Sequence, residues 1–424
     1  MSFQETINSK GHILYWIPDT KYQYNSEKIL GMDLDWTIIK PIHGKIHPRD
    51  ENDWEFFTDK LTRIKTAIDN GYKFIIFTNQ AGLLSEKKNQ LTLEGFKIRW
   101  DNIYARLQRE FGISSVWLLA SLYDDFNRKP CTGMWEFVEK HLNGDMKVDR
   151  NKSLYVGDMA GRKADYSSSD LLFAMNSGVE FQVPEVFYND SKDPVNKTKK
   201  LIDQVNKDDK IFKGSKLLED YETGSKKHVT KDNANKLGEI RKMLREEEKQ
   251  YLVIVIGSPA SGKSSYYTRN LKSVLGKKHI YLSMDKFNGT PAKFAKEVDK
   301  QLKDNKTVII DNTNGTVKTR EKLISLAIQN NIPVIGIHFT TPKDIVKHLN
   351  ALRTKITNVQ VLNNNVDEGH SVPAVAIHSY WKHLEEPNTA SEHMLKVFKI
   401  DYEPVFHESD KRECIRKEDF IMLI

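Results

Sequence analysis

The segment that most constrains the fold is a glycine-rich loop directly after an apolar run. The run YLVIVIG, residues 251–257, leads into GSPASGKSS, where Gly257, Gly262, Lys263 and Ser264 match the pattern G-x-x-x-x-G-K-S/T. Such a loop between a strand and a helix turns backbone N–H groups toward phosphates, while the lysine reaches the terminal phosphates and the serine binds Mg²⁺. The sequence therefore predicts an α/β domain that binds ATP. The predicted contacts with the nucleotide are Gly257, Ser258, Pro259, Ala260, Ser261, Gly262, Lys263, Ser264 and Ser265.

Other residues of this region indicate phosphoryl transfer, with Lys263 itself among the catalytic candidates. Asp285 follows the run HIYLSM and is the predicted catalytic base, although an aspartate there also suits a helix N-cap. Asp311 ends the run TVIID, at the edge where open α/β sheets bind ligands. Arg320 and Arg353 follow on helical stretches, and we expect both to contact the phosphates and Arg353 to assist catalysis. The alternative for either arginine is a surface position.

The first part of the chain has its own succession of apolar runs. They lie at 31–34, 72–78, 115–120 and 153–157, with amphipathic stretches between them. This alternation predicts βαβ units and a parallel sheet. Because the runs at 251–257, 279–284, 307–311 and 332–340 follow the same rhythm, we expect two doubly wound parallel-sheet α/β domains.

Polar groups follow these runs in the first domain. Asp33 and Asp35 in MDLDWT are two residues apart, so a strand directs both to one side, toward one phosphate and one metal ion. Carboxylates crowded in this way favour a bound cation such as Mg²⁺. Thr78 ends the next run, Lys129 supplies a fixed positive charge, and Asp158 follows the run SLYVG. Four such elements in this order indicate a phosphate site.

These elements resemble the haloacid dehalogenase-type phosphatases over about residues 31–190. The resemblance implies that Asp33 attacks phosphorus to form an aspartyl-phosphate, with Asp35 as general acid and then base. It also implies that Thr78 holds the phosphoryl oxygens and that Lys129 neutralises charge. Asp33, Asp158 and the backbone carbonyl of Asp35 would then bind Mg²⁺.

Three further residues lie near these elements in sequence. Trp36 stands where most members of that family have glycine, and its ring can narrow the entrance, stack on a nucleobase or, as is commonest for tryptophan, pack on the sheet. Asp165 and Asp170 lie close to Asp158 in sequence. We expect Asp165 to support the metal ligands without binding the ion.

Both halves together resemble the polynucleotide kinase 3′-phosphatases, over about residues 30–405, on strings such as GMDLDWTII, RKPCTGMWEF, YVGDMAGRKADYSSSD and GSPASGKSS. The resemblance implies an enzyme that removes 3′-phosphates and phosphorylates 5′-hydroxyls at breaks in nucleic acid, for DNA repair. Met284 departs from it, since members often have arginine there. About 30 residues precede the first of these strings, so we expect no forkhead-associated domain and no scaffold binding of that kind.

Length and composition agree with this organisation. The 424 residues predict two or three domains, which we assign as a phosphatase domain at 1–190, a Lys-rich connector at 191–248 and a kinase domain at 249–424. The net charge of +7 is compatible with a polyanionic partner. Cys131 and Cys414 offer no disulfide framework, and we find neither a signal peptide nor an apolar run of the ~18 residues that span a bilayer. We expect an intracellular monomer without membrane contact, nuclear or cytoplasmic.

Other functions stay open at this point. If Trp36 blocks the first site, the chain is a 5′-kinase with an impaired phosphatase domain. A small-molecule kinase fused to an unrelated phosphatase, a non-catalytic nucleic-acid-binding protein and an RNA end-repair enzyme are further alternatives. Residue types alone do not separate DNA ends from RNA ends.

Overall fold

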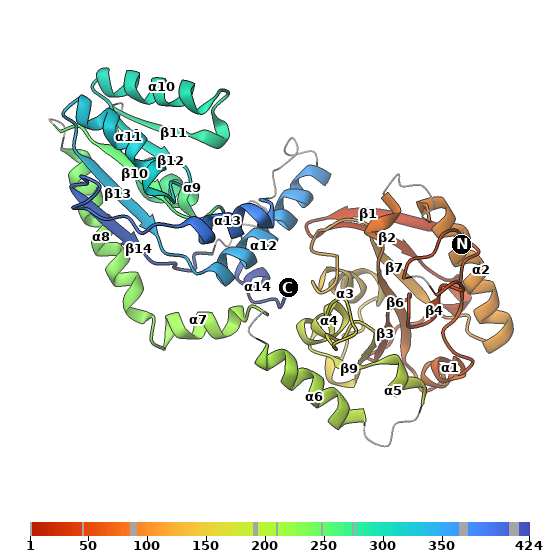
Figure 1. The fold of residues 1–424 in the computed structure, drawn as a ribbon. Helices are drawn as coiled ribbons and strands as arrows, with labels where there is room; N and C mark the ends of the chain where they lie inside the picture. The colour runs from red at the N-terminus through yellow and green to blue at the C-terminus, as the bar shows by residue number, and fades with distance from the viewer. Residues whose placement is uncertain are drawn as a thin grey trace. The chain divides into compact units, whose positions relative to one another are not determined.

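The computed structural model describes residues 2–44, 46–84, 91–189, 194–208, 211–246, 249–273, 275–276, 278–363, 372–406 and 415–424. The chain forms two compact units (Figure 1). Unit 1 comprises Met1–Lys213, Arg353–His370 and His407–Ile424, and unit 2 comprises Gly214–Leu352 and Ser371–Phe406. The segment 191–248, expected to be a connector, is thus shared between the units. Cys131 is buried with a free thiol, and Cys414 lies outside the described residues.

Unit 1 is built on a seven-stranded sheet in the order β1-β2-β7-β6-β3-β8-β9. Its elements are β1 (Phe3–Asn8), β2 (Gly11–Trp16), β3 (Ile29–Met32), β4 (Ile39–Lys40), β5 (Glu55–Phe56), α1 (Thr62–Asp69), β6 (Lys73–Asn79), α2 (Leu93–Phe111), β7 (Trp117–Ser121), α3 (Gly133–Phe137), β8 (Leu154–Val156), α4 (Ser169–Ser177), β9 (Glu180–Gln182), α5 (Pro184–Tyr188), α6 (Pro194–Lys207) and α14 (Lys417–Phe420). The strands from β7 to β9 pair in parallel, as the βαβ rhythm predicts. The antiparallel hairpin β1–β2, which we did not expect, extends the sheet beyond β7.

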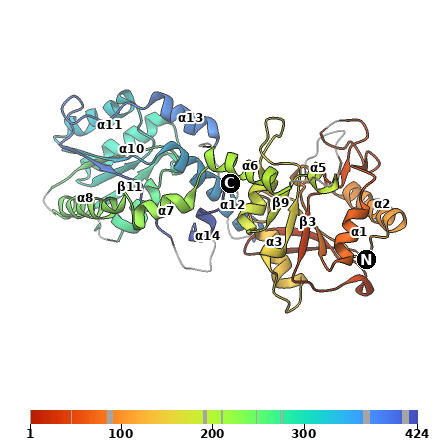
Figure 2. The same cartoon turned by 90° about the horizontal axis from the view of Figure 1, so that it is seen from below.

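Both faces of this sheet are covered, which explains the nearly continuous apolar character of its strands. In β6, Phe74 and Ile76 pack into one core together with side chains of α1 and α2. Their neighbours Ile75 and Phe77 pack into a second core with side chains of α3 and α4. Figure 2 shows α1 and α2 on one side of β3 and α3 on the other. The alternation of a strand thus divides each apolar run between two cores.

Unit 2 contains a five-stranded sheet in the order β11-β12-β10-β13-β14, with every neighbouring pair parallel. Its elements are α7 (Gly214–Glu222), α8 (Lys227–Arg245), β10 (Leu252–Ile256), α9 (Lys263–Tyr266), β11 (His279–Ser283), α10 (Pro291–Lys303), β12 (Thr307–Asp311), α11 (Val317–Gln329), β13 (Val334–Phe339), α13 (Ala374–His383) and β14 (Lys396–Ile400). Helix α12 (Lys343–Leu362) begins in unit 2 and continues into the stretch that clusters with unit 1. The expected α/β class therefore holds for both units.

Helices again cover the two faces of the second sheet. Side chains of α10 and α11 share a core with Leu252 and Ile254 of β10. Ile240 and Leu244 of α8 pack with Val253 and Val255 on the opposite face. Figure 1 shows α10 and α11 on one side of this sheet and α8 on the other. Helix α8 is therefore part of the fold of unit 2. Among the described helices, none combines the length and the apolar composition needed to cross a bilayer.

A buried ion pair stabilises the edge of unit 2 that follows β12. Arg320 of α11 and Glu392 are 0% and 3% exposed, and the guanidinium donates to both carboxylate oxygens, at 2.6 and 2.8 Å. Arg320 Nη1 also donates to the carbonyl oxygen of Asn314 at 3.0 Å, and the Asn314 amide donates to Val255 O of β10 at 2.8 Å. The pair thereby holds the loop after β12 against the central strand.

We expect Glu392→Gln to lower the free energy of unfolding of unit 2 by about 3–5 kcal/mol, because it leaves the Arg320 charge buried without its partner. Hydrogen exchange of the β10 and β12 amides measures this effect. The control is Lys303→Gln, which breaks an ion pair with Asp299 at the surface and costs less than about 1 kcal/mol. Equal protection in both variants would contradict the role given to this pair.

Candidate active sites

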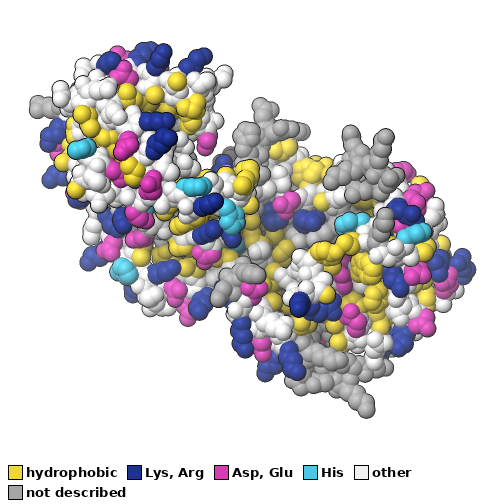
Figure 3. Space-filling view, viewed as in Figure 1, with side chains coloured by type: hydrophobic (Ala, Val, Ile, Leu, Met, Phe, Trp, Pro, Cys, Tyr) yellow, Lys and Arg dark blue, Asp and Glu magenta, His cyan; other side chains and the backbone are white. Residues whose placement is uncertain are grey.

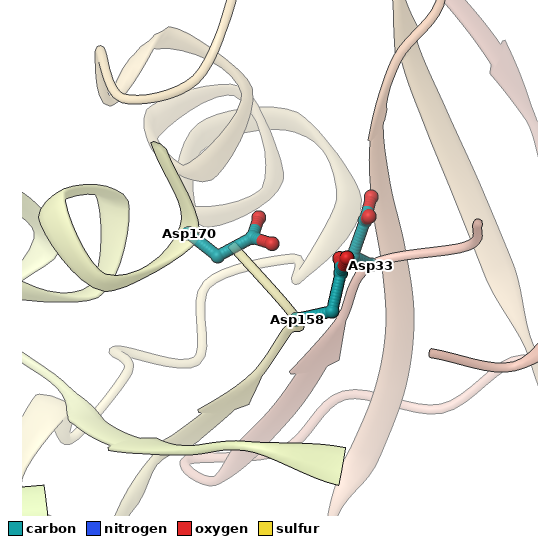
Figure 4. A group of neighbouring side chains, drawn as sticks. All are labelled: Asp33, Asp158 and Asp170. Atoms are coloured by element: carbon teal, nitrogen blue, oxygen red, sulfur yellow. The ribbon is translucent and has the colours of Figure 1, made fainter. Parts of the chain in front are cut away.

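Three carboxylates from separate elements of unit 1 converge at the carboxyl edge of its sheet. Asp33 follows β3, Asp158 follows β8, and Asp170 lies in the first turn of α4. One oxygen of each lies within 4.8 Å of the others, and Figure 4 shows the three side chains pointing toward one another. Asp158 Oδ1 is buried and has no hydrogen-bond partner among the described residues. This orphaned acceptor and its neighbours form a donor set that suits a hard cation.

Lys129 is the cation that the structure places in this cluster. Its Nζ donates to Asp33 Oδ1 and to Asp170 Oδ1, each at 2.7 Å, and to the Tyr155 hydroxyl at 2.9 Å. Asn79 fixes the backbone of Lys129. Its Oδ1 accepts from Lys129 N at 3.0 Å, and its Nδ2 donates to Lys129 O at 3.1 Å. The side-chain amide of Asn79 therefore bonds to the backbone that carries the lysine.

The electrostatics of the cluster are those of a site short of positive charge. Burial raises the pKa of Asp33 above its ordinary value, and although Lys129 lowers it, Asp170 raises it further. Burial also raises the pKa of Asp158, as do the charges of Asp33 and Asp170. Burial lowers the pKa of Lys129, but the two carboxylates it contacts raise it by more, so the lysine stays charged. One cation thus faces three acids, which favours binding of a second.

Asp170 is the member of the cluster that sequence reasoning missed. It is 1% exposed and also accepts from Met159 N at 3.0 Å, across the loop after β8. A Cβ on Gly157 would lie 2.5 Å from its carboxylate, so only glycine leaves room for Asp170 at this place. The available signal was an acid in the first turn of a helix shortly after YVGD. Asp165, in contrast, accepts from Ala160 N and Arg162 N at 3.0 and 2.9 Å and holds that loop in shape.

Asp35 stands apart from this cluster and has different partners. Its Oδ2 accepts from Gln80 Nε2 at 2.7 Å, and its Oδ1 lies 3.5 Å from Nη1 of Arg99 on α2. Gln80 Nε2 also donates to Thr78 Oγ1 at 2.9 Å, so Thr78 and Asp35 share one donor. The Asp35 side chain is 27% exposed, and Arg99 is 1% exposed. Neither Gln80 nor Arg99 was among the predicted site residues.

Trp36 adopts a left-handed backbone conformation with a φ of 59°. This conformation favours glycine, the residue that most haloacid dehalogenase-type phosphatases have at this position. The ring is half-buried, joins neither core of unit 1, and donates from Nε1 to Ile46 O at 3.3 Å. The structure therefore does not favour packing on the sheet, which was the commonest role for such a ring.

The loop after β10 has the shape of a phosphate cradle. Gly262 has a φ of 93° and Ala260 a φ of 61°, and the loop leads directly into α9. Lys263 Nζ donates to the carbonyl oxygens of Gly257 and Ser258, at 3.0 and 2.8 Å. The hydroxyls of Ser258 and Ser261 are buried without a hydrogen-bond partner among the described residues. Pro259 and Ser265 complete the loop, half-buried and exposed respectively.

Acidic groups from the neighbouring strands lie at the same edge of the second sheet. Ser264 Oγ donates to Asp311 Oδ2 at 2.6 Å, and the Tyr281 hydroxyl donates to the same oxygen. Ser283, at the end of β11, pairs in register with Asp311. Asp285 follows two residues later, exposed, in a short 3₁₀ turn at Met284–Lys286. The structure thus brings Ser264 and Asp311 together and places Asp285 beyond the end of the adjacent strand.

The two arginines expected at the phosphates lie in different surroundings. Arg320 is fully buried in its ion pair with Glu392 and supports the Asn314 loop. A guanidinium that is bonded to both oxygens of a buried carboxylate has few N–H groups left for a phosphate. Arg353 is exposed on α12, at the first residue of the stretch that clusters with unit 1. Its contact with phosphate stays a prediction.

Comparisons with known proteins agree with two catalytic domains. Residues 28–188 match the family model of the polynucleotide kinase 3 phosphatases, and residues 252–372 match that of an AAA domain. The bifunctional polynucleotide phosphatase/kinase of Schizosaccharomyces pombe is 27% identical over 379 residues, which cover 89% of this chain and 80% of that protein. A protein of Acanthamoeba polyphaga mimivirus is 28% identical over an alignment of 381 positions, which covers 82% of each chain.

The polynucleotide 3′-phosphatase of Saccharomyces cerevisiae is 32% identical over an alignment of 207 positions, which covers 87% of that protein and 38% of this chain. The match to the phosphatase family model, residues 28–188, lies in unit 1, where the carboxylates converge around Lys129. On these matches, the chain belongs to the polynucleotide kinase 3′-phosphatase family.

Proposed function

We propose that this chain heals nucleic-acid ends by removing 3′-phosphates in unit 1 and phosphorylating 5′-hydroxyls with ATP in unit 2. The observation that carries the proposal is the convergence of Asp33, Asp158 and Lys129 at one sheet edge, in a chain that has a phosphate cradle on a second sheet. The relatives named above act on polynucleotides. Both products are the ends that a ligase joins, so DNA repair is the proposed setting, inside the cell, in the nucleus or the cytoplasm.

In the phosphatase reaction, an oxygen of Asp33 attacks phosphorus while the bond from phosphorus to the 3′ oxygen breaks. Asp35 donates its proton to that oxygen, which leaves as the 3′-hydroxyl. A water molecule then attacks the aspartyl-phosphate, gives its proton to Asp35, and releases inorganic phosphate and Asp33. Lys129 contacts Asp33 directly and offsets the charge that develops on the phosphoryl group, and Thr78 donates to its oxygens.

The same edge of the sheet fits Mg²⁺. Asp33, Asp158 and the backbone carbonyl of Asp35 are the proposed ligands, and the converging geometry adds Asp170 as a further carboxylate beside them. The orphaned oxygen of Asp158 and the raised pKa values of Asp33 and Asp158 support this fit, since each is relieved by a cation. When bound, the ion supplies positive charge to the phosphoryl oxygens.

In unit 2, Asp285 is the proposed base that accepts the proton of the 5′-hydroxyl as its oxygen attacks the γ-phosphate of ATP, while the bond from that phosphorus to the bridging oxygen breaks and ADP leaves. Lys263 exchanges its bonds to the loop carbonyls for bonds to phosphate oxygens, and Arg353 assists. Ser264 and Asp311, already in contact, are the groups that would hold Mg²⁺ with the nucleotide. Because one chain carries both sets of residues, we propose that it acts as a monomer.

We propose DNA ends as the substrate, with RNA ends as the alternative. The net charge is +7, and on the visible face in Figure 3 Lys and Arg are interspersed with Asp and Glu. Such a surface holds nucleic acid through its phosphates, with little base preference and with an affinity that falls as salt rises. A 5′-kinase with an impaired phosphatase domain is the second candidate, and the assembled acids of unit 1 argue against it.

The two activities should be separable by mutation. Asp33→Asn removes the nucleophile, so we expect 3′-phosphate release to fall at least about 10³-fold while 5′ phosphorylation is retained. Lys263→Ala should do the reverse. Both ends of one nicked duplex with a 3′-phosphate and a 5′-hydroxyl are followed together, beside an RNA equivalent. Phosphatase turnover within a factor of a few of wild type in Asp33→Asn would refute the aspartyl-phosphate route.

Asp170→Asn tests the metal site in unit 1. Loss of this charge beside the proposed ligands should raise the Mg²⁺ concentration for half-maximal phosphatase activity by about 10-fold or more. The Mg²⁺ dependence of 5′ phosphorylation should stay unchanged, which serves as an internal control. Asp145→Asn removes an exposed charge from the same unit and is the matched variant. An unchanged Mg²⁺ requirement in Asp170→Asn would show that Asp170 takes no part in metal binding.

Asp285→Asn tests the base in unit 2. The amide keeps the shape of the side chain but accepts no proton, so we expect kcat for 5′ phosphorylation to fall about 10²-fold with little change in KM for ATP. Steady-state kinetics with a single-stranded 5′-hydroxyl oligonucleotide measures both constants. If KM for ATP rises sharply while turnover at saturation persists, Asp285 binds the nucleotide instead.

A further inference from the structure

Arg99 is a buried charge that the reaction described above does not use. It lies on the sheet-facing side of α2, next to Phe96 and Trp100 of the core, and is 1% exposed. Its contact with a carboxylate is the 3.5 Å approach of Nη1 to Asp35 Oδ1. Nε and Nη2 are buried without a hydrogen-bond partner among the described residues.

Burying Arg99 in this way lowers the stability of the fold, so stability alone does not explain its position. A buried guanidinium is compensated only when its N–H groups are paired in good geometry, and Arg320 of unit 2 shows what this looks like, with two short bonds to Glu392. Arg99 has one long contact with a carboxylate instead, and its guanidinium lies over the Phe96 ring, 5.5 Å from the ring centroid. Burial lowers the pKa of Arg99, whereas the negative charges of Asp35 and Asp53 raise it. The guanidinium stays charged, and these carboxylates offset part of the cost of burying it.

We propose, resting on the phosphatase function above, that Arg99 is a positioning residue that aims the Asp35 carboxyl group at the leaving 3′ oxygen. Gln80 Nε2 donates to Oδ2 of Asp35 at 2.7 Å, and Arg99 of α2 approaches Oδ1. The two donors together fix the plane of the Asp35 carboxyl group. The separation of 3.5 Å is at the long limit for a hydrogen bond.

The proton transfer shows why this matters. As Asp33 bonds to phosphorus and the 3′ oxygen leaves, the proton moves from Asp35 to that oxygen, and Asp35 becomes a carboxylate. Arg99 and Gln80 stabilise this carboxylate, an interaction that is stronger after the proton has gone than before. When the carboxylate takes a proton back from the attacking water, the charge disappears again. Arg99 thus favours the first step through Asp35 without touching the substrate.

Two substrates with different leaving groups separate this role from a structural one. A 3′-phosphate end needs a proton on its leaving oxygen, whereas the p-nitrophenolate leaving group of p-nitrophenyl phosphate does not. Since kcat/KM reports steps up to formation of the aspartyl-phosphate, Arg99→Gln should lower it about 10²-fold for the 3′-phosphate oligonucleotide. For p-nitrophenyl phosphate the change should stay within about three-fold. Arg99→Lys, which keeps the charge, should restore part of the loss.

The matched control is Arg106→Gln on the same helix, which breaks an exposed ion pair with Glu110 and should affect neither substrate. Retained 5′ phosphorylation shows that the Arg99 variants are folded in unit 2, and far-UV circular dichroism reports on the whole chain. Should Arg99→Gln fail to fold, the same comparison of substrates is made with Arg99→Lys, where a loss of at least about three-fold confined to the 3′-phosphate supports the proposal.

Equal losses for both substrates would mean that Arg99 is structural, and no loss for either would mean that Asp35 is positioned without it. Both results overturn the proposal. Asp35→Asn is measured beside these variants and should show the same confinement to the 3′-phosphate. If Asp35→Asn itself lowers both substrates equally, the acid role of Asp35 in the proposed function fails, and this outcome is distinct from a failure of Arg99 alone.

Discussion

The contact of Lys129 with Asp33 and Asp170 is the interaction on which the first site depends. Both bonds are 2.7 Å long and join three buried charges. Removing any one of them would leave another charge buried without compensation, at a cost of several kcal/mol. The surrounding groups serve this arrangement: Asn79 fixes the lysine backbone, and Gly157 leaves the space that Asp170 fills. A site with net negative charge is thereby kept assembled.

The second site also holds its buried carboxylate in place, but without a buried cation. Asp311 accepts from Ser264 and Tyr281, so its carboxylate is satisfied by neutral hydroxyls instead of a buried cation. Those bonds are exchanged at low cost when a phosphate or a metal ion arrives. The buried ion pair of unit 2, Arg320 with Glu392, lies behind the Asn314 loop and keeps it in place. Rigid support and exchangeable contacts are thus separated in this unit.

Sequence reasoning identified what depends on local pattern and missed what depends on packing. The runs around Asp33, Thr78 and Asp311 became strands, because alternating burial on two faces leaves a clear apolar signal. The partners of Asp35 were not predictable in the same way, since Arg99 reaches it from a helix and its spacing there is that of any amphipathic helix. Arg320 shows the opposite error: we expected it at the phosphates, but it lies in a buried ion pair. Nothing in its sequence neighbourhood reveals Glu392, the carboxylate that binds it.

The hairpin formed by β1 and β2 has a practical consequence. It pairs with β7 and so covers the hydrogen-bonding edge of the strand that would otherwise end the parallel sheet. The match to the phosphatase family begins at residue 28, beyond this hairpin. A shortened protein that starts there would expose the backbone of β7 as an open edge, and such edges pair with other chains. We expect such a protein to be poorly soluble because its chains pair through this strand, although its catalytic residues are unchanged.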